Sequence, residues 1–445
     1  MFYYSQQWNQ LNKNYKAAQI ELLFFKEMYT PLYSKILNLN EKARFHMPGH
    51  SGKDFFEFKA NKMDITEIEG MDNLLTSSGV ILDAEKEIAR AYGYNYSLMV
   101  TQGSTICMHM SIYLAKILKV KIIAYGKMHS SFYNGIKLFG CSYEEYDDIE
   151  KIKDVLQKCT TRVAIFTTSP DYFGKVKDLE QINNLGADLV IVDAAHGAHF
   201  VYSDVLPKYP KADIVFSSMH KTMPAQTGSA IINVDDGLLF DYLKHIRAMT
   251  HSTSPNYMSM ASMDLARAYF EEQGAALYLN IKNTIDKYNG HFSRYEIEKV
   301  DDISRLVINT KDDSALDIAS KLHKAGFDVE MAIDNKLVFI LTPFNIDKVS
   351  LLEKAIDSIE AEKLHSLATD TNTNIEYGNM EGKRLAFVNI DEAEGLISNA
   401  QICIYPPSIP VIQIGQIIKK EDINILNEHK EHLLGLVNGK VPVLK

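Results

Sequence analysis

Two stretches of the chain, ADLVIVDAAHGAHF (residues 187–200) and ADIVFSSMHKTMPAQTGSAII (residues 212–232), decide its fold class. Each starts with a short apolar run and continues into a polar turn, as a buried strand does where it meets a loop. Runs of this kind recur between about residues 95 and 235, at Ser97–Thr101, Lys121–Tyr125, Val163–Thr167, Asp188–Val192, Ile214–Ser217 and Ser229–Val234. Roughly 10–20 residues of amphipathic, helix-like sequence separate several of them. The alternation predicts an α/β fold with a mostly parallel sheet covered by helices.

The sequence on either side of this region differs in character. Residues 1–45 include AAQIELLFFKEMYTPLYSKIL, which is apolar at helical spacings and predicts an N-terminal helical arm. Residues 46–295 are predicted to form the large domain, with long helices over 258–285. Residues 296–445 are predicted to form a smaller α+β domain, because short strand-like runs alternate with helical stretches there. The runs are Arg305–Asn309 and Lys336–Thr342, and the stretches are Ser314–Lys324 and Lys348–Leu364.

Composition narrows the classes of partner. The 445 residues carry a net charge of −10 with both signs mixed, and no basic run resembles a nucleic-acid footprint. No apolar run reaches the ~20 residues that span a bilayer, and the N-terminus lacks the features of a secretory signal. The four cysteines (Cys107, Cys141, Cys159 and Cys403) are scattered without metal-ligand spacing. We therefore expect a cytoplasmic protein with reduced thiols, no metal, and neither nucleic acid nor membrane as partner.

Two charged side chains follow consecutive predicted strands. Asp193 comes directly after an apolar strand, where a carboxylate is costly unless it has a partner. A protonated pyridine nitrogen is one such partner, and capping of the next segment is the alternative. Lys221 lies in a polar turn, and an amine that forms a Schiff base needs a lowered pKa; the alternative is a solvated loop lysine. Because ligands bind beyond the carboxyl ends of such strands, the pair together predicts bound pyridoxal 5′-phosphate (PLP).

Two weaker signals agree with this hypothesis. Gly103, Ser104 and Thr105 open a predicted helix, and a helix N-terminus of this composition binds phosphate, although an ordinary N-cap has the same appearance. His129 follows another strand and is placed to stack on a flat aromatic ligand. The alternative for His129 is a hydrogen-bonded histidine near a helix start.

Several blocks of sequence, in order, resemble one known family. They are TPLY (30–33), HMPGHSG (46–52), GMDNLLTSSGVILDAE (70–85), QGST (102–105), TTSPDYFG (167–174), VDAAHGAHF (192–200), SSMHKTMPAQTGS (217–229), STSPNYMSMASMDLA (252–266) and YPPSIPVIQIGQ (405–416). On these blocks the chain resembles the Orn/Lys/Arg decarboxylases, the group III basic amino-acid decarboxylases of PLP fold type I. The resemblance implies a large domain with the fold of aspartate aminotransferase. It also implies a short form that lacks the N-terminal wing domain of the inducible enzymes, so the ring-shaped decamers of those enzymes are not expected here.

The resemblance also implies residue roles. Lys221 would carry the cofactor with His220 beside it, and Asp193 would pair with the ring nitrogen. The other implied cofactor contacts are Gly103, Ser104, Thr105 and Ser218 around the phosphate, His129 and Ala195 on the two ring faces, and His196. Thr253 and Ser254 lie in the segment that completes the neighbouring subunit's site in the family, which implies a homodimer with shared active sites. His46 and Gln416 are the candidate contacts to the substrate.

The chain departs from the family pattern at several positions. The family has HKS at 129–131, STHK at 218–221, DEAHGAH at 193–199, YPPGIP at 405–410 and PGE at 414–416, whereas this chain has Ser130, Met219, Ala194, Ser408 and Gln416. The glutamate of PGE is a candidate partner for the distal cation of the substrate, and Gln416 lacks that charge. The cofactor end of the pattern is therefore intact, and the substrate end is altered.

The function that these residues imply is PLP-dependent α-decarboxylation of an amino acid, with lysine, ornithine and arginine as the candidate substrates, in polyamine metabolism. Either Lys221 or His220 would deliver the proton that replaces the carboxylate. Two alternatives stay open. One is a PLP aminotransferase or lyase, in which Arg305 or Arg384 would hold the α-carboxylate. The other is a PLP-binding homologue with reduced activity.

Overall fold

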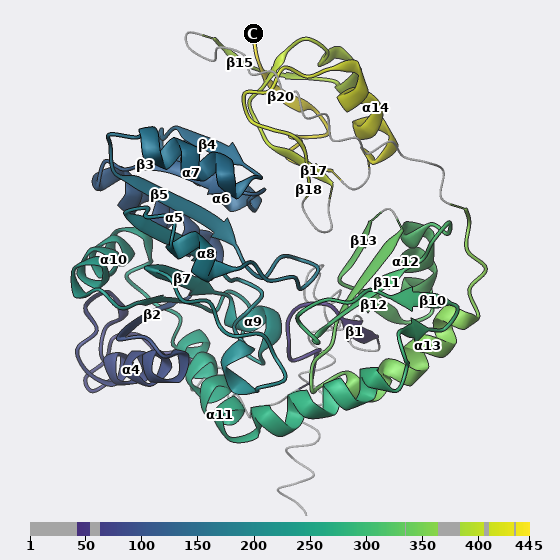
Figure 1. The fold of residues 1–445 in the computed structure, drawn as a ribbon, viewed down its shortest axis with the longest axis horizontal. Coiled ribbons are helices and arrows are strands. Elements are labelled where there is room, and N and C mark those ends of the chain that lie inside the picture. The colour runs from purple at the N-terminus through teal and green to yellow at the C-terminus, as the bar shows by residue number, and fades with distance from the viewer. Residues whose placement is uncertain (1–41, 54–62, 334, 364–382, 405–408, 431–432) are drawn as a thin grey trace, which may run out of the picture. The chain divides into compact units, whose positions relative to one another are not determined.

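A seven-stranded sheet forms the centre of the fold in the computed structural model (Figure 1), which describes residues 42–53, 63–333, 335–363, 383–404, 409–430 and 433–445. Its spatial order is β2-β8-β7-β6-β5-β3-β4. The strands are β2 (Tyr96–Val100), β3 (Lys121–Tyr125), β4 (Tyr143–Tyr146), β5 (Val163–Thr168), β6 (Leu189–Asp193), β7 (Ile214–Ser217) and β8 (Ala230–Val234). Neighbouring strands from β4 to β7 are parallel, whereas β8 is antiparallel to both β7 and β2. Six of the seven strands thus run in one direction, and their carboxyl ends share one edge.

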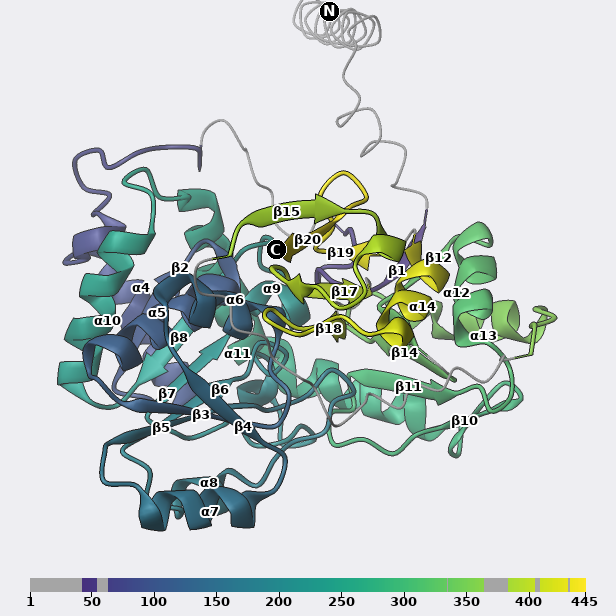
Figure 2. The same ribbon diagram turned by 90° about the horizontal axis from the view of Figure 1, so that it is seen from above.

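Helices cover both faces of this sheet. They are α4 (Val80–Tyr92), α5 (Gly103–Ile117), α6 (Ser130–Phe139), α7 (Ile149–Lys158), α8 (Leu179–Asn183), α9 (Met219–Thr222), α10 (Gly237–Thr250) and α11 (Tyr257–Asp286). Apolar residues of α5, α6 and α10 pack with one set of strand side chains, among them Ile191. Apolar residues of α4, α7, α8 and α11 pack with the strand side chains on the other face of the sheet, among them Val190 and Val192. Figure 2 shows α7 and α8 together on this second face. The strands are continuous apolar runs because both of their faces are buried.

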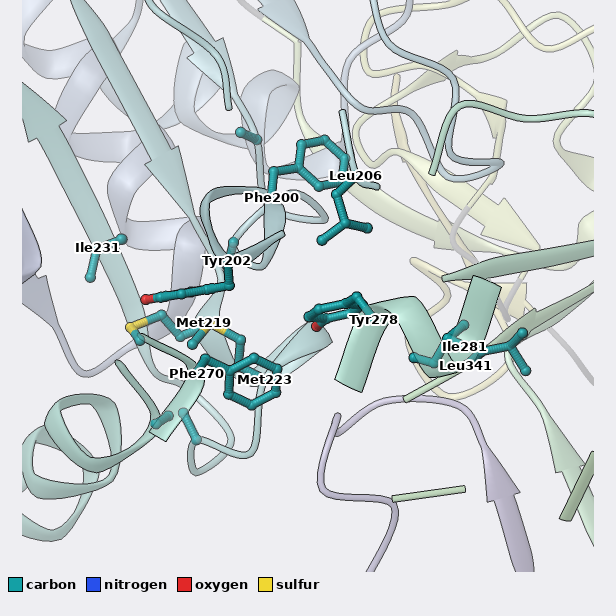
Figure 3. Close-up of a cluster of buried hydrophobic side chains, with 14 of the residues drawn as sticks. Phe200, Tyr202, Leu206, Met219, Met223, Ile231, Phe270, Tyr278, Ile281 and Leu341 are labelled. Atoms are coloured by element: carbon teal, nitrogen blue, oxygen red, sulfur yellow. The ribbon is translucent and has the colours of Figure 1, made fainter. Parts of the chain in front are cut away.

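Aromatic and sulfur-containing side chains fill the core beneath the segments that follow β6 and β7 (Figure 3). Phe200 and Tyr202 come from the first segment, and Met219 and Met223 come from the second. They meet Phe270 and Tyr278 of α11, whose ring centroids lie 5.7 Å apart. Burial of such large side chains, each worth about 1.5–3 kcal/mol, anchors the segment that follows Asp193 and the segment that contains Lys221.

The chain beyond α11 builds smaller sheets. A five-stranded sheet has the order β13-β14-β11-β10-β9, and β1 pairs in parallel with β12. These strands are β1 (Ala43–Phe45), β9 (His291–Phe292), β10 (Tyr295–Ile297), β11 (Arg305–Asn309), β12 (Phe327–Val329), β13 (Met331–Ile333) and β14 (Lys336–Ile340), with helices α12 (Ala315–Lys324) and α13 (Val349–Asp357). Two three-stranded sheets follow, β15-β20-β16 and β18-β17-β19. Their elements are β15 (Leu385–Val388), β16 (Ile397–Ser398), β17 (Ile402–Ile404), β18 (Ile409–Ile412), α14 (Lys420–Glu428), β19 (Leu433–Leu434) and β20 (Val441–Leu444).

The fold class expected from the sequence is confirmed. The predicted strands Lys121–Tyr125 and Ile214–Ser217 have the observed bounds, and the other predicted strands of the large sheet differ by one residue at one or both ends. Strand β4 was not expected, because its sequence, YEEY, has no apolar run. Of the predicted helical arm, residues 1–41 lie outside the described part, and residues 43–45 belong to β1. Within the described residues, every helix is too short or too polar to cross a bilayer.

Candidate active site

Asp193 and Lys221 lie at the shared carboxyl edge of the sheet. Asp193 ends β6 and is 5% exposed, and its Oδ1 accepts a hydrogen bond of 3.0 Å from the backbone N–H of Ala195. Burial raises the pKa of Asp193 to about 6, against the opposing effects of the Lys221 charge and that hydrogen bond. Burial also lowers the pKa of Lys221, whereas the carboxylates of Asp193 and Glu330 oppose the shift. The buried side chain of Asp193 and the partly buried side chain of Lys221 therefore influence each other's charge at one edge of the sheet.

A histidine and an arginine extend this site. Nζ of Lys221 lies 3.1 Å from Nε2 of His196, and Nδ1 of His196 lies 2.9 Å from Nη2 of Arg305. His196 and Arg305 are 4% and 3% exposed, so water does not separate these groups. The ring of Tyr172 lies against His196 with a centroid distance of 4.7 Å.

The start of α5 lies beside the loop that carries Lys221. Gly103 adopts a φ of 78°, and its N–H donates to the carbonyl of Gly228. Ser104 and Thr105 form the first turn of the 15-residue helix, and the hydroxyl of Ser218 donates to that of Ser104 over 2.8 Å. The N–H groups of a first helical turn and these hydroxyls are the donors that a phosphate group needs.

His129 is the N-cap of α6, and its Nδ1 accepts a hydrogen bond of 3.1 Å from the N–H of Ser131. Burial, with help from the charge of Lys221, lowers the pKa of His129 to about 4. A neutral imidazole held in one orientation and within electrostatic reach of Lys221 fits the role of an aromatic surface for a planar ligand.

The HMPGHSG block packs against the lysine loop. The N–H of Gly49 donates to the carbonyl of His220, and a Cβ at position 49 would lie 2.7 Å from the backbone carbon of Thr222. Glycine is therefore required there. His46 lies in the same block, with its Nδ1 against the carbonyl of Met47, whose N–H donates to Glu330.

Nδ1 of His220 is engaged in a hydrogen bond and is therefore not free for acid–base catalysis. Its Nδ1 donates a hydrogen bond of 3.0 Å to the carbonyl of Ser229, since a carbonyl only accepts. Burial lowers the pKa of His220 to about 4, against the opposing effect of that hydrogen bond.

Three expected residues have no contact with this cluster in the described part of the chain. Thr253 and Ser254 are exposed. Gln416 is buried within the segment after residue 383, where its Oε1 accepts from the N–H of Gln413 and its Nε2 donates to Asp422 over 3.0 Å.

Sequence reasoning missed Glu330 and considered Arg305 only as a carboxylate clamp. Glu330 lies between two short strands far along the chain, and nothing in its neighbourhood signals a site. Arg305 is the first residue of β11, and its side chain packs against Gly174 of the TTSPDYFG turn. Gly174 has a φ of 86°, and a Cβ there would lie 2.8 Å from Cγ of Arg305. That glycine in a polar turn was the available signal.

The fold is that of the PLP-dependent enzymes of fold type I. The constitutive lysine decarboxylase of E. coli superposes with a TM-score of 0.68 at 16% identity, over 88% of this chain and 76% of that one. An L-threonine transaldolase from Pseudomonas fluorescens gives a TM-score of 0.59 at 12% identity, over 78% of this chain and 89% of that one.

Sequence comparison specifies the family. The family model "Orn/Lys/Arg decarboxylase, major domain" matches residues 30–143 and 132–348, so the chain belongs to the Orn/Lys/Arg decarboxylase family. An uncharacterised Bacillus subtilis protein, YaaO, is 28% identical over 92% of this chain and 96% of its own length. An arginine decarboxylase of the same organism is 27% identical over 89% of this chain and 93% of its own. The resemblance read from the sequence motifs is confirmed, and the chain is an amino-acid decarboxylase by family.

Proposed function

We propose that this protein binds PLP covalently through Lys221 and removes the α-carboxyl group of lysine, ornithine or arginine as CO2, leaving the corresponding amine. The observation that carries the proposal is that Asp193, a buried carboxylate in need of a cationic partner, lies within electrostatic reach of Lys221, a partly buried amine with a lowered pKa. A pyridinium nitrogen and an aldehyde carbon are the two groups that this pair suits.

The remaining residues of the cluster fit the same ligand. Ser104, Thr105 and Ser218 offer hydroxyls and helix N–H groups for its phosphate. His129 and Ala195 would cover the two faces of its ring, and His196 lies next to the reactive amine. When bound, PLP supplies the electron sink that accepts the pair left on the substrate Cα as CO2 departs.

The chain's own side chains would prepare and complete this reaction. The carboxylate of Asp193 keeps the ring nitrogen protonated, because burial makes an unpaired charge costly at that place. The amine of Lys221, once released from the cofactor, can hold a proton and return it to Cα. His220 is the other candidate donor, through Nε2, because its Nδ1 already donates to Ser229.

The choice of a basic substrate rests on the family and on relatives such as the arginine decarboxylases of Bacillus subtilis and Bacillus anthracis. Gln416 does not support a basic substrate, because its amide is engaged with Gln413 and Asp422.

We further propose a cytoplasmic homodimer. The exposed segment at Thr253 and Ser254 is consistent with a second subunit, and the free cysteines suit a reducing compartment.

The test is a screen of the standard amino acids and ornithine for CO2 release by the PLP-loaded chain, with borohydride reduction followed by peptide mapping. We expect CO2 from a basic amino acid and a reduced adduct on Lys221, absent in Lys221→Ala. An adduct on a different lysine would refute the assignment of Lys221. Amino-group transfer to a keto acid without CO2 would favour the aminotransferase alternative, and PLP binding without turnover would favour the homologue of reduced activity.

A further inference from the structure

Three side chains form a continuous hydrogen-bonded row that ends at the amine of Lys221. Arg305 enters from β11 of the five-stranded sheet, His196 lies in the loop after β6, and Lys221 lies in α9. The two contacts measure 2.9 Å and 3.1 Å, and the two distal members are almost fully buried. The row thus joins two sheets at the reactive nitrogen.

The chemistry of the three groups fixes which atoms carry protons. A guanidinium has only N–H donors, so Nδ1 of His196 must accept from Arg305 and carries no proton. The proton of the neutral imidazole is then on Nε2, which must donate to Nζ of Lys221. An ammonium has no lone pair to accept that bond, so the observed contacts are satisfied when Lys221 is a neutral amine.

We propose that Arg305 is a positioning residue that acts through His196: it holds the imidazole in the tautomer that donates to Lys221 and thereby keeps the Lys221 amine neutral and oriented for bond formation. The proposal rests on the proposed function in so far as a neutral amine is the form that attacks the cofactor's aldehyde carbon. It also assigns His196 a fixed role as hydrogen-bond donor, because an imidazole protonated on Nε2 and occupied on Nδ1 has no free nitrogen to take the proton of Lys221.

The other charges around Lys221 act on its protonation in opposite directions. Asp193 after β6 and Glu330 between β12 and β13 both favour the ammonium form, whereas burial and Arg305 oppose it. The remaining titratable neighbours are Tyr172, whose ring centroid lies 5.9 Å from Nζ of Lys221, and the two histidines His129 and His220. Burial together with the charge of Lys221 lowers the pKa of each histidine to about 4. Burial is the largest effect that favours the neutral amine, and the Arg305–His196 row adds to it against the two carboxylates.

The experiment measures the protonation of Lys221 in the full chain after removal of PLP. Trace acetylation with acetic anhydride, read at the Lys221 peptide by mass spectrometry, gives the pH midpoint at which the amine becomes reactive. We expect Arg305→Met to raise this midpoint by about one pH unit or more, a tenfold loss of neutral amine below it. Arg305→Lys keeps a donor and a charge and should restore much of the shift. Arg384→Met is the matched control, since Arg384 is exposed in the described structure.

A double-mutant cycle separates positioning from charge alone. His196→Ala should raise the midpoint by itself, and Arg305→Met should then add little. A full Arg305→Met shift in the His196→Ala background would overturn the proposal, because Arg305 would then act without the imidazole. An unchanged midpoint in folded Arg305→Met protein, judged by its thermal unfolding, would overturn it as well. Acetylation needs no PLP, so failure of borohydride trapping would count against the proposed function alone.

Discussion

At the scale of single residues, the environment of Asp193 leads to a specific prediction about the pH dependence of PLP binding. Its pKa of about 6 without the cofactor lies above the ordinary 3.8, so part of the population is protonated in mildly acidic buffer. A cationic ring pairs only with the ionised carboxylate. PLP should therefore bind with its full affinity above pH 6, and its affinity should fall as pH drops through 6, by about tenfold per pH unit at most.

Asp193→Asn isolates this effect from the titration of the PLP phosphate itself. The variant should bind PLP with a shallower pH dependence, and its turnover should fall on the order of 10²–10³-fold because the ring nitrogen loses its anionic partner. Spectroscopic PLP titrations at a series of pH values measure the first effect, and CO2 release measures the second. Identical pH curves for the two proteins would show that Asp193 is not the ring partner.

At the scale of elements, a buried ion pair joins α4 and α10 next to the edge strand β2. Arg247 and Glu85 are 0% and 1% exposed, and their side chains are paired. Arg247 also donates to the carbonyl of Met99 over 3.1 Å and to Ser77 over 3.2 Å, while Glu85 accepts from the N–H of Met99. The pair thus satisfies backbone groups of β2 as well as its own charges.

Arg247→Met should lower the free energy of unfolding by about 3–5 kcal/mol, because it leaves the Glu85 carboxylate buried without its cation. The double variant Glu85→Leu/Arg247→Met removes both charges and should recover a large part of that loss. Urea unfolding at neutral pH measures both, and Arg162→Met, which breaks an exposed pair with Asp188, is the control. A double variant less stable than Arg247→Met would mean that the backbone contacts of β2 matter more than the charges.

At the scale of the whole molecule, the link between the large sheet and the five-stranded sheet is polar as well as apolar. Nε2 of His199, in the loop after β6, lies 3.1 Å from both Asp302 and Ser304, next to the start of β11. Both His199 and Asp302 are fully buried. Burial alone would raise the pKa of Asp302, but His199, Arg305 and Ser304 together lower it to about 2.

Because the folded-state pKa of Asp302 lies below the ordinary 3.8, its contribution to stability is present above pH 4 and is lost as pH falls towards 2. Asp302→Asn should therefore cost about 2–3 kcal/mol at pH 7, and the deficit should shrink below pH 4 as the natural protein loses the same contribution. Thermal unfolding from pH 7 to pH 3 measures this convergence. A deficit that is independent of pH would assign the loss to packing rather than to charge.

The large sheet was predictable from the sequence because its strands are buried on both faces and appear as continuous apolar runs. Strand β4 was not predicted because its sequence, YEEY, has no apolar run, and the strand lies at the edge of the sheet. The candidate site was predictable in part, since residues that follow consecutive parallel strands meet at one edge whatever the loops do. The roles of Thr253, Ser254 and Gln416 were expected from motif position alone and stay predictions.

By itself, the sequence determined the fold class, the family and the placement of Asp193 and Lys221 at one edge of the sheet. Each depends on order along the chain: apolar runs, turns and the residues directly after them. Tertiary structure alone decided what surrounds the amine. Arg305 and Glu330 lie more than a hundred residues from His196, and hydrogen-bond partners across that separation depend on how two sheets pack. Periodicity indicates which face of an element is buried, but it does not indicate which hydrogen-bond donor from another sheet lies opposite that face.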